Sequence, residues 1–339
     1  MPVAIRLYPA IGAGGTGRPR APWGRGPAGL DDPSHARFVP RHPDGLATWG
    51  LTRYKGAVRT TDPSGQTARA AAKVAGSALA VGAASAGLLA AQGYQTYRTV
   101  GRRRSAPHYV DGRYGTRRGV SLRLAFLGDS GATGLGAAHG HQTPAALLAE
   151  HLAERSGRPV LLSVIASVGA RTEHLADQVD RALIIRPNVA VIFIGVNDVS
   201  HLVPQQTSVR RLAMAVTRLR EGGSEVVVGT CPDLGTLRPI RPPLRNVVRR
   251  ASRRLAQSQR VAVRAAGGWP VSLGAVLGPE FAARPLEMFS SDQFHPSEAG
   301  YAAMVDALRP VVLAAAGYGP APRPALPGTT SRGVSVTVS

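Results

Sequence analysis

Four short segments of the chain carry the residue types needed for acyl transfer. Ser130 supplies a hydroxyl nucleophile, and His295 supplies an imidazole base with the carboxylate of Asp292 three residues before it. The side-chain amide of Asn197 and the backbone N–H of Gly169 can each donate a hydrogen bond to a negatively charged oxygen. The segments are Gly128-Asp129-Ser130, Ser167-Val168-Gly169, Gly195-Val196-Asn197-Asp198 and Asp292-Gln293-Phe294-His295.

Three of these segments directly follow short apolar runs that are typical of buried parallel strands. Ligands bind at the carboxyl ends of the strands in open α/β sheets, so we expect Ser130, Gly169 and Asn197 to meet at one edge. Each residue also has a plainer interpretation, because Asp-Ser after a strand commonly caps a turn and Asn is a frequent turn former. The three runs are residues 122–128, 159–166 and 188–194.

Asp292 and His295 lie just before the last expected helix, which begins at Pro296 or Ser297. A spacing of three residues lets the Asp292 carboxylate accept the Nδ1 proton of His295, which leaves Nε2 free to accept the proton of Ser130. The alternative is that the His-Pro pair only caps the helix.

In this order the four segments resemble the motifs of the SGNH hydrolases, also called GDSL-type esterases and lipases, over residues 121–316. The resemblance implies that Ser130, Asp292 and His295 are catalytic and that Ser130, Gly169 and Asn197 form the oxyanion hole, with no cofactor. The chain departs from the family pattern at two places. Gly131 follows the serine where the family usually has leucine, and Val164-Ile165-Ala166 stands where the family often has an asparagine before the glycine.

Strand and helix patterns alternate from residue 122 to residue 315, which predicts right-handed βαβ units and an α/β fold with a three-layer, doubly wound parallel sheet. The resemblance implies the flavodoxin-like arrangement of the SGNH hydrolases. The expected strands are 122–128, 159–166, 188–194 and 224–230, with an edge segment near 269–273. The expected helices are 143–155, 172–183, 206–221, 244–264 and 297–315, the last with a kink or break at Pro310.

The segments outside residues 121–316 differ in composition. Residues 1–68 are rich in Gly, Pro and Arg without a helical or strand period, which predicts a disordered extension, and a wrongly chosen upstream start codon would make it non-native. Residues 95–120 are expected to form a basic linker, and residues 317–339, with four prolines, a disordered tail.

Residues 69–94 are expected to form an apolar helix. The 20 residues 74–93 carry no charge, and as a helix they would span roughly 30 Å, about the thickness of the hydrocarbon core of a bilayer. The segment therefore predicts a signal anchor or a signal-peptide core, and hence membrane association through 74–93 or secretion. An alanine-rich helix packed on the domain of a cytoplasmic protein is the alternative.

The chain carries a formal charge of +21. Only two of its 41 basic residues are lysines, Lys55 and Lys73, which indicates a compositional preference for arginine, and aromatic residues are sparse. We therefore expect no nucleic-acid partner. Nine arginines and no acidic residue lie between Arg238 and Arg264 on an expected helix. This run is either a solvated face or a surface for anionic lipid or an acidic polymer.

The histidines and the cysteine suggest no further chemistry. The histidines lack the cysteine or carboxylate arrangement of a metal site, so we expect no metal. The single Cys231 excludes an intramolecular disulfide and is either a small buried residue or part of the site wall. The histidines considered are His139, His141, His151, His174 and His201.

Three functional hypotheses follow from the sequence. The first is a monomeric serine hydrolase that cleaves carboxylic esters, with lipids and acylated sugars among the candidate substrates, through an acyl-enzyme intermediate. The second is an acyltransferase that uses the same residues to pass the acyl group to an alcohol. The third is a membrane-tethered binding module with an inactive site.

Overall fold

A six-stranded sheet forms the centre of the fold in the computed structural model, which describes residues 63–101 and 106–320. The strand order is β1-β3-β2-β4-β5-β6, and all neighbouring strands are parallel except the antiparallel pair β1 and β3. The bounds are β1 Gly112–Tyr114, β2 Leu122–Gly128, β3 Val160–Val164, β4 Val189–Phe193, β5 Glu225–Gly229 and β6 Trp269–Val271.

The two central strands are apolar because helices cover both of their faces. Every residue of β4 is buried, as is every residue of β2 except Arg123. In the register, Gly128 at the end of β2 lies opposite Phe193 at the end of β4, and Phe193 lies opposite Gly229 of β5. The carboxyl ends of β2, β4 and β5 are therefore level with one another, and the segments that follow them begin at one edge of the sheet.

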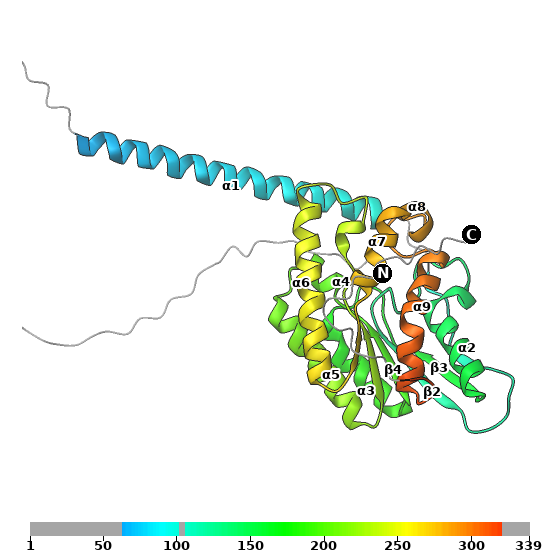
Figure 1. Cartoon of the computed structure of the whole chain (residues 1–339). Helices are drawn as coiled ribbons and strands as arrows, with labels where there is room; N and C mark the ends of the chain where they lie inside the picture. The colour runs from blue at the N-terminus through cyan, green and yellow to red at the C-terminus, as the bar shows by residue number, and fades with distance from the viewer. Residues whose placement is uncertain (1–62, 102–105, 321–339) are drawn as a thin grey trace, which may run out of the picture. The chain divides into compact units, whose positions relative to one another are not determined.

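Helices pack on the two faces of the sheet, which confirms the expected three-layer α/β fold (Figure 1). Helices α2, α7, α8 and α9 contribute to the core on one face, whereas α3 and α5 contribute to the core on the other, and α6 packs against α5 and β6. The α-helices of this part are α2 Pro144–Ser156, α3 Leu175–Ile185, α4 Val196–Ser200, α5 Gln205–Glu221, α6 Leu244–Ala265, α7 Leu273–Ala283, α8 Pro285–Met288 and α9 Glu298–Ala315. Single 3₁₀ turns are η1 Gly140–Gln142, η2 Thr172–His174 and η3 Leu234–Thr236.

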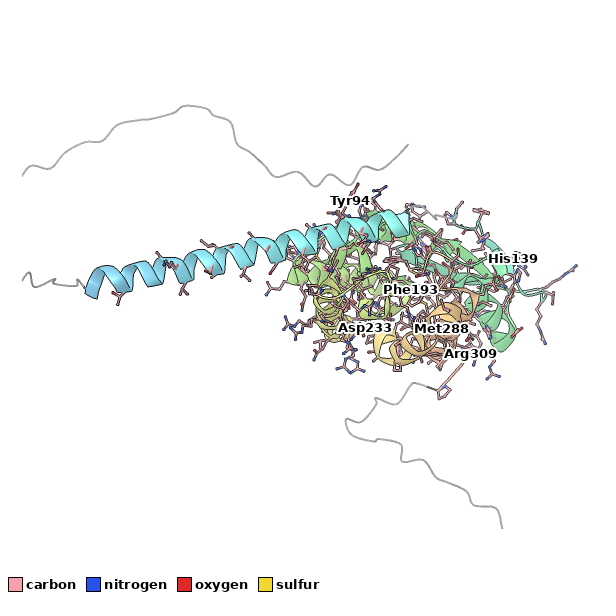
Figure 2. All side chains as sticks on the ribbon, turned by 90° about the horizontal axis from the view of Figure 1, so that it is seen from above. Tyr94, His139, Phe193, Asp233, Met288 and Arg309 are labelled. Carbon is pink, nitrogen blue, oxygen red and sulfur yellow. The ribbon has the colours of Figure 1, made fainter. Side chains whose placement is uncertain are left out.

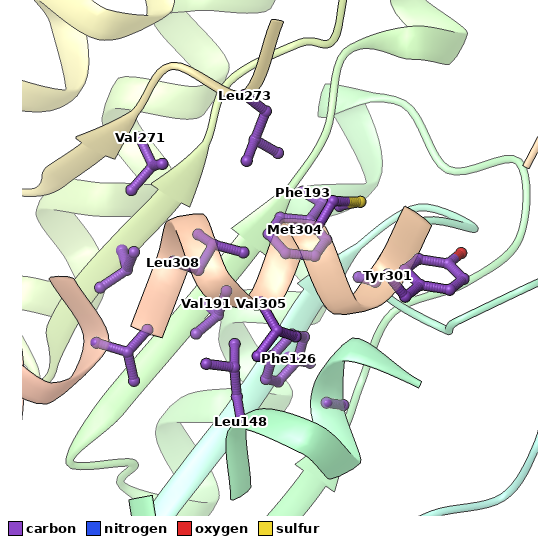
Figure 3. Close-up of a cluster of buried hydrophobic side chains, with 14 of the residues drawn as sticks. Phe126, Leu148, Val191, Phe193, Val271, Leu273, Tyr301, Met304, Val305 and Leu308 are labelled. Carbon is purple, nitrogen blue, oxygen red and sulfur yellow. The ribbon is translucent and has the colours of Figure 1, made fainter. Parts of the chain in front are cut away.

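The core between the sheet and α9 holds this helix against β2, the strand that Ser130 follows. Phe126 of β2 and Val191 of β4 lie in one cluster with Leu148 of α2 and Leu308 of α9 (Figure 3). At the start of α9 the hydroxyl of the fully buried Tyr301 donates a hydrogen bond to the carbonyl of Leu135, at 2.8 Å. This contact ties the helix that follows His295 to the loop that follows Ser130.

Three features differ from the sequence-based expectations. Residues 95–120, expected to be a linker, contain the end of α1 and the strand β1, whose pairing with β3 is a long-range contact that no local pattern reveals. Helices α7 and α8 lie between the edge strand and α9, where the sequence pattern indicated no element. Helix α9 continues through Pro310 without a break. Pro310 is exposed, so the backbone hydrogen bond that its missing N–H cannot make is lost on the solvent face of the helix.

Helix α1 (Pro63–Gly101) is longer than the expected 69–94, and its stretch Ala72–Thr96 is long and apolar enough to cross a membrane, with a mean hydropathy of 1.7. No residue of its most apolar window is buried. Near its end, the amide of Gln92 donates to the carbonyl of Pro242 at 2.8 Å and accepts from the N–H of Leu244 at 3.2 Å, at the start of α6. Most of the expected extension 1–68 and tail 317–339 lies outside the described residues.

Candidate active site

Ser130, His295 and Asp292 form one row of hydrogen bonds. Nε2 of His295 lies 3.0 Å from Oγ of Ser130, and Nδ1 of His295 lies 2.6 Å from Oδ2 of Asp292. Asp292 and His295 are buried, whereas Ser130 is half-buried and faces a cavity. The three side chains that the sequence singled out as nucleophile, base and acid are thus in direct contact.

The Asp292 carboxylate is held in its ionised form. Burial alone would raise its pKa, but hydrogen bonds from the ring and the backbone N–H of His295 and from the N–H of Phe294 outweigh that effect and lower the pKa of Asp292 to about 2. The hydroxyl of Ser290 donates a further hydrogen bond to Oδ1 of Asp292, at 2.8 Å. A charged, fixed carboxylate can orient the imidazole at neutral pH.

Ser130 sits on a tight turn that only glycine permits at its start. Gly128 has φ +121°, and a Cβ there would lie 1.8 Å from the carbonyl oxygen of Phe193. The N–H of Asp129 donates to that same oxygen at 2.9 Å, and the carbonyl of Ser130 accepts from the N–H of Leu135 and the hydroxyl of Thr133. The close approach of β2 and β4 therefore fixes the direction in which the chain leaves the sheet toward Ser130.

Gly169 lies on the turn after β3 and Asn197 lies on α4 after β4, and β3 and β4 are the strands on either side of β2. The N–H of Ser167 donates to the carbonyl of Gly128 at 3.1 Å, which ties the turn containing Gly169 to the end of β2. The Asn197 side chain donates one amide hydrogen to the carbonyl of Ala170 at 3.0 Å and keeps a second N–H. Gly169 has φ +81°, and a Cβ there would meet no atom within 4 Å. The structure thus brings Asn197 to the residue next to Gly169.

Two buried glutamines, which no sequence motif indicated, brace the strand ends around this site. Gln178 of α3 accepts from the N–H of Gly128 at 2.7 Å and donates to its carbonyl at 3.0 Å. Gln259 of α6 donates to the carbonyl of Ile194 and accepts from the N–H of Cys231. A glutamine on the apolar face of an expected helix is the sequence feature that indicates such a residue, because a buried amide requires hydrogen-bond partners.

Asp129, next to Ser130, is a buried carboxyl with an unusual pKa. Burial, helped by the charge of Asp198, raises its pKa to about 7, against the opposing hydrogen bond from the N–H of Gly131. Its Oδ2 atom makes no hydrogen bond with the described residues. Burial also raises the pKa of the Cys231 thiol, so this residue is a buried, unreactive thiol.

An apolar cavity of about 110 Å³ adjoins Ser130 and His295. It lies between the ends of β4 and β5 and helices α7 and α9, so the segment after β6 supplies much of its wall. Its apolar lining includes Phe193, Leu234, Leu237, Leu273, Leu277 and Phe281.

No group of three or more His, Cys, Asp or Glu side chains that could hold a metal ion occurs within residues 63–101 and 106–320. The rings of His139 and His141 stack on each other with centroids 5.5 Å apart. Figure 2 shows His139 at the periphery of the α/β part and Phe193 in its interior.

The fold is that of an α/β protein with Ser130, His295 and Asp292 in contact at one edge of its sheet. Comparison with known families shows to which family such a chain belongs. The model of the GDSL-like lipase/acylhydrolase family matches residues 126–303, and the chain belongs to this family. The match includes all five residues of the candidate site.

The chain is also similar to individual proteins. The chain is similar to the GDSL-like esterase Rv1075c of Mycobacterium tuberculosis, with 46% identity over 189 residues that cover 55% of this chain and 60% of that protein. Among solved structures it is similar to TesA, with 20% identity and a TM-score of 0.48 over 57% of this chain and 99% of that chain. It is also similar to the acetylxylan esterase Axe2 of Geobacillus stearothermophilus, with 17% identity and a TM-score of 0.45 over 61% of this chain and 99% of that chain.

Proposed function

We propose that the protein is a serine hydrolase that cleaves carboxylic esters through an acyl-enzyme intermediate. The observation that carries the proposal is the row of hydrogen bonds from Ser130 Oγ through the ring of His295 to Asp292, with 3.0 Å and 2.6 Å between the bonded atoms. Membership of the GDSL-like family supports it as well.

In the first half of the reaction, Ser130 Oγ attacks the ester carbonyl and His295 accepts the hydroxyl proton at Nε2. The ionised Asp292 keeps the other ring proton on Nδ1, so that Nε2 presents a lone pair to Ser130. The oxygen that becomes negative in the tetrahedral intermediate accepts hydrogen bonds from the N–H groups of Ser130 and Gly169 and from the free amide hydrogen of Asn197. Protonated His295 then returns its proton to the leaving alcohol, and the acyl group remains on Ser130.

In the second half, water replaces the alcohol. His295 accepts a proton from the water as it attacks the acyl carbonyl, and then returns this proton to Ser130 Oγ as the carboxylic acid leaves. The apolar cavity beside Ser130 favours an ester with an apolar acyl chain, because its walls offer phenyl and leucine side chains to that chain.

A panel of p-nitrophenyl esters from acetate to palmitate, hydrolysed by the full chain, tests the proposal. We expect turnover and a higher kcat/KM for at least one acyl chain longer than acetyl. The same assay with added alcohols separates hydrolysis from transfer, since acyl transfer that saturates with alcohol and exceeds hydrolysis would show an acyltransferase. No turnover of any ester, together with no labelling by a fluorophosphonate, would instead indicate a binding module.

We further propose that α1 anchors the protein to a membrane or directs its export. Its apolar stretch Ala72–Thr96 has 25 residues, which as a helix span roughly 37 Å. The full chain should therefore fractionate with membranes. Arginine at both Leu88 and Leu89 should move it to the soluble fraction, because each charge near a helix centre costs about 3 kcal/mol in the bilayer, whereas alanine at both positions should not. An uncleaved wild-type chain in the soluble fraction would contradict the anchor.

A further inference from the structure

We propose that Asp198 is a positioning residue that, through Thr172, fixes the turn carrying Gly169 relative to Asn197, and so sets the distance between two donors of the oxyanion hole. The inference rests on the proposed hydrolase function and adds to it a residue with no role so far. Asp198 directly follows Asn197 on α4, and Thr172 lies three residues after Gly169.

The contact between Asp198 and Thr172 is extensive and shielded from water. The hydroxyl of Thr172 donates to Oδ1 of Asp198 at 2.6 Å, and its N–H donates to Oδ2 at 3.1 Å. Each residue is only 1% exposed. Hydrogen bonds to a carboxylate are about twice as strong as neutral ones, and burial strengthens them further.

The neighbouring contact acts in parallel with this one. Asn197 donates to the carbonyl of Ala170, and the next residue, Asp198, accepts from Thr172. Two adjacent residues of α4 therefore bind the segment just after Gly169 at two points. The turn is anchored on its other side by the hydrogen bond from Ser167 to Gly128. Gly169 lies between these anchors and is exposed, with a φ of +81° and open space where a Cβ would lie, so its position depends on the anchors on either side.

The residues before the turn offer it no polar side chain. Val164, Ile165 and Ala166, just before the turn, have apolar side chains that offer it no hydrogen bond, whereas the carboxylate of Asp198 on α4 binds Thr172 directly. A displacement of a catalytic group by about 1 Å can cost about 100-fold in rate. The donors of the oxyanion hole act mainly in the transition state, so their displacement on loss of this contact should lower kcat more than it raises KM.

The test compares kcat and KM of the full chain for four variants, each normalised to active sites titrated with a fluorophosphonate. Asp198→Ala should lower kcat 10- to 100-fold with KM within threefold of wild type. Asp198→Asn should recover kcat to within fivefold of wild type, because its amide can accept from the Thr172 N–H and donate to the Thr172 hydroxyl. Thr172→Val should also lower kcat, but by a smaller factor than Asp198→Ala, because the N–H of residue 172 can still donate to Asp198. Thr172→Ser, which keeps the hydroxyl, should have a kcat close to that of wild type.

Thr143→Val is the matched control. Thr143 is also a fully buried threonine whose hydroxyl donates to a carbonyl and accepts from a backbone N–H, but it caps α2, and the methyl group that it places beside Gly134 is retained in valine. It should lower the melting temperature without changing kcat per titrated site. Equal kcat in Asp198→Ala and wild type, or a kcat in Asp198→Asn as low as in Asp198→Ala, would overturn the inference.

A double-variant cycle adds a measurement that a general loss of stability would not change. If Asp198 acts through the oxyanion donors, Asp198→Ala should cost several-fold less in a chain that already carries Asn197→Ala. Losses that multiply would show that Asp198 acts independently and would contradict the inference. Failure of the hydrolase proposal is separate, since Ser130→Ala would then keep the wild-type rate whatever Asp198 does.

Discussion

The ring of His295 lies 3.0 Å from the hydroxyl of Ser130, although 165 residues separate them in the chain. Two anchors maintain this distance. Tyr301, at the start of α9, donates to the carbonyl of Leu135 in the loop after Ser130. The carbonyl of His295 accepts a hydrogen bond from the N–H of Ser290 at 2.8 Å, and this contact joins the two ends of the loop that contains Asp292. These two hydrogen bonds therefore hold the ring of His295 beside the hydroxyl of Ser130.

The first prediction concerns the base. His295→Ala should lower kcat about as much as loss of the nucleophile, and the double variant with Ser130→Ala should lose little more, because each change already disables the same proton transfer. Steady-state kinetics of the two single variants and the double variant measure this. Losses that multiply in the double variant would assign His295 a separate task.

The second prediction concerns the amide donor. Asn197→Ala should lower kcat by about 10² to 10³ with little change in KM, because its hydrogen bond strengthens as the carbonyl oxygen becomes negative. Asn197→Asp should be at least as harmful, since it places an acceptor where a donor is needed. A rise in KM at unchanged kcat would show that Asn197 binds substrate and does not stabilise the transition state.

The third prediction compares two glycines that both have positive φ. Gly128→Ala should destabilise the protein by about 4 kcal/mol or more, because the new Cβ would lie 1.8 Å from the carbonyl oxygen of Phe193. Gly169→Ala should lower the free energy of unfolding by only about 1–2 kcal/mol, because a Cβ there would meet no atom within 4 Å and only the left-handed backbone conformation is unfavourable for alanine. Chemical denaturation of both variants measures the difference. Equal destabilisation would contradict the role of the close approach between β2 and β4.

The sequence predicted those parts of the site that depend on local pattern. Apolar runs located the strands whose ends carry Ser130 and Asn197, and the spacing of three between Asp292 and His295 sufficed to predict their contact. The chain order of the segments, together with the resemblance they carry, identified the family.

Contacts between distant segments could not be read from the sequence in the same way. The partner of Asp198 lies 26 residues earlier, and nothing in either segment indicates that their side chains meet. Strand β1 has three residues, too few for a strand pattern, and exists because of its pairing with β3. The walls of the cavity come partly from α7, whose glycines and proline obscured its helical character.

The fourth prediction concerns pH and Asp129. Its pKa is raised from 3.8 to about 7 in the folded protein, so between these values the folded state binds more protons than the unfolded state. Stability contributed by this group is therefore present below pH 4 and is lost as the pH rises toward 7. Asp129→Asn removes the titration, so its free energy of unfolding relative to wild type should increase from pH 4.5 to pH 8. Urea denaturation at both values measures this, and a difference independent of pH would contradict it.

The most direct test of the account is the activity of Ser130→Ala in the full chain. If Ser130 is the nucleophile, kcat for the best ester of the p-nitrophenyl panel should fall by about 10³ or more, and the rate that remains should come from the oxyanion donors and binding alone. Circular dichroism and the melting temperature should stay close to those of wild type, because the half-buried hydroxyl makes its hydrogen bond only with His295 among the described residues. A folded Ser130→Ala variant with kcat within tenfold of wild type would contradict the assignment of Ser130 as the nucleophile.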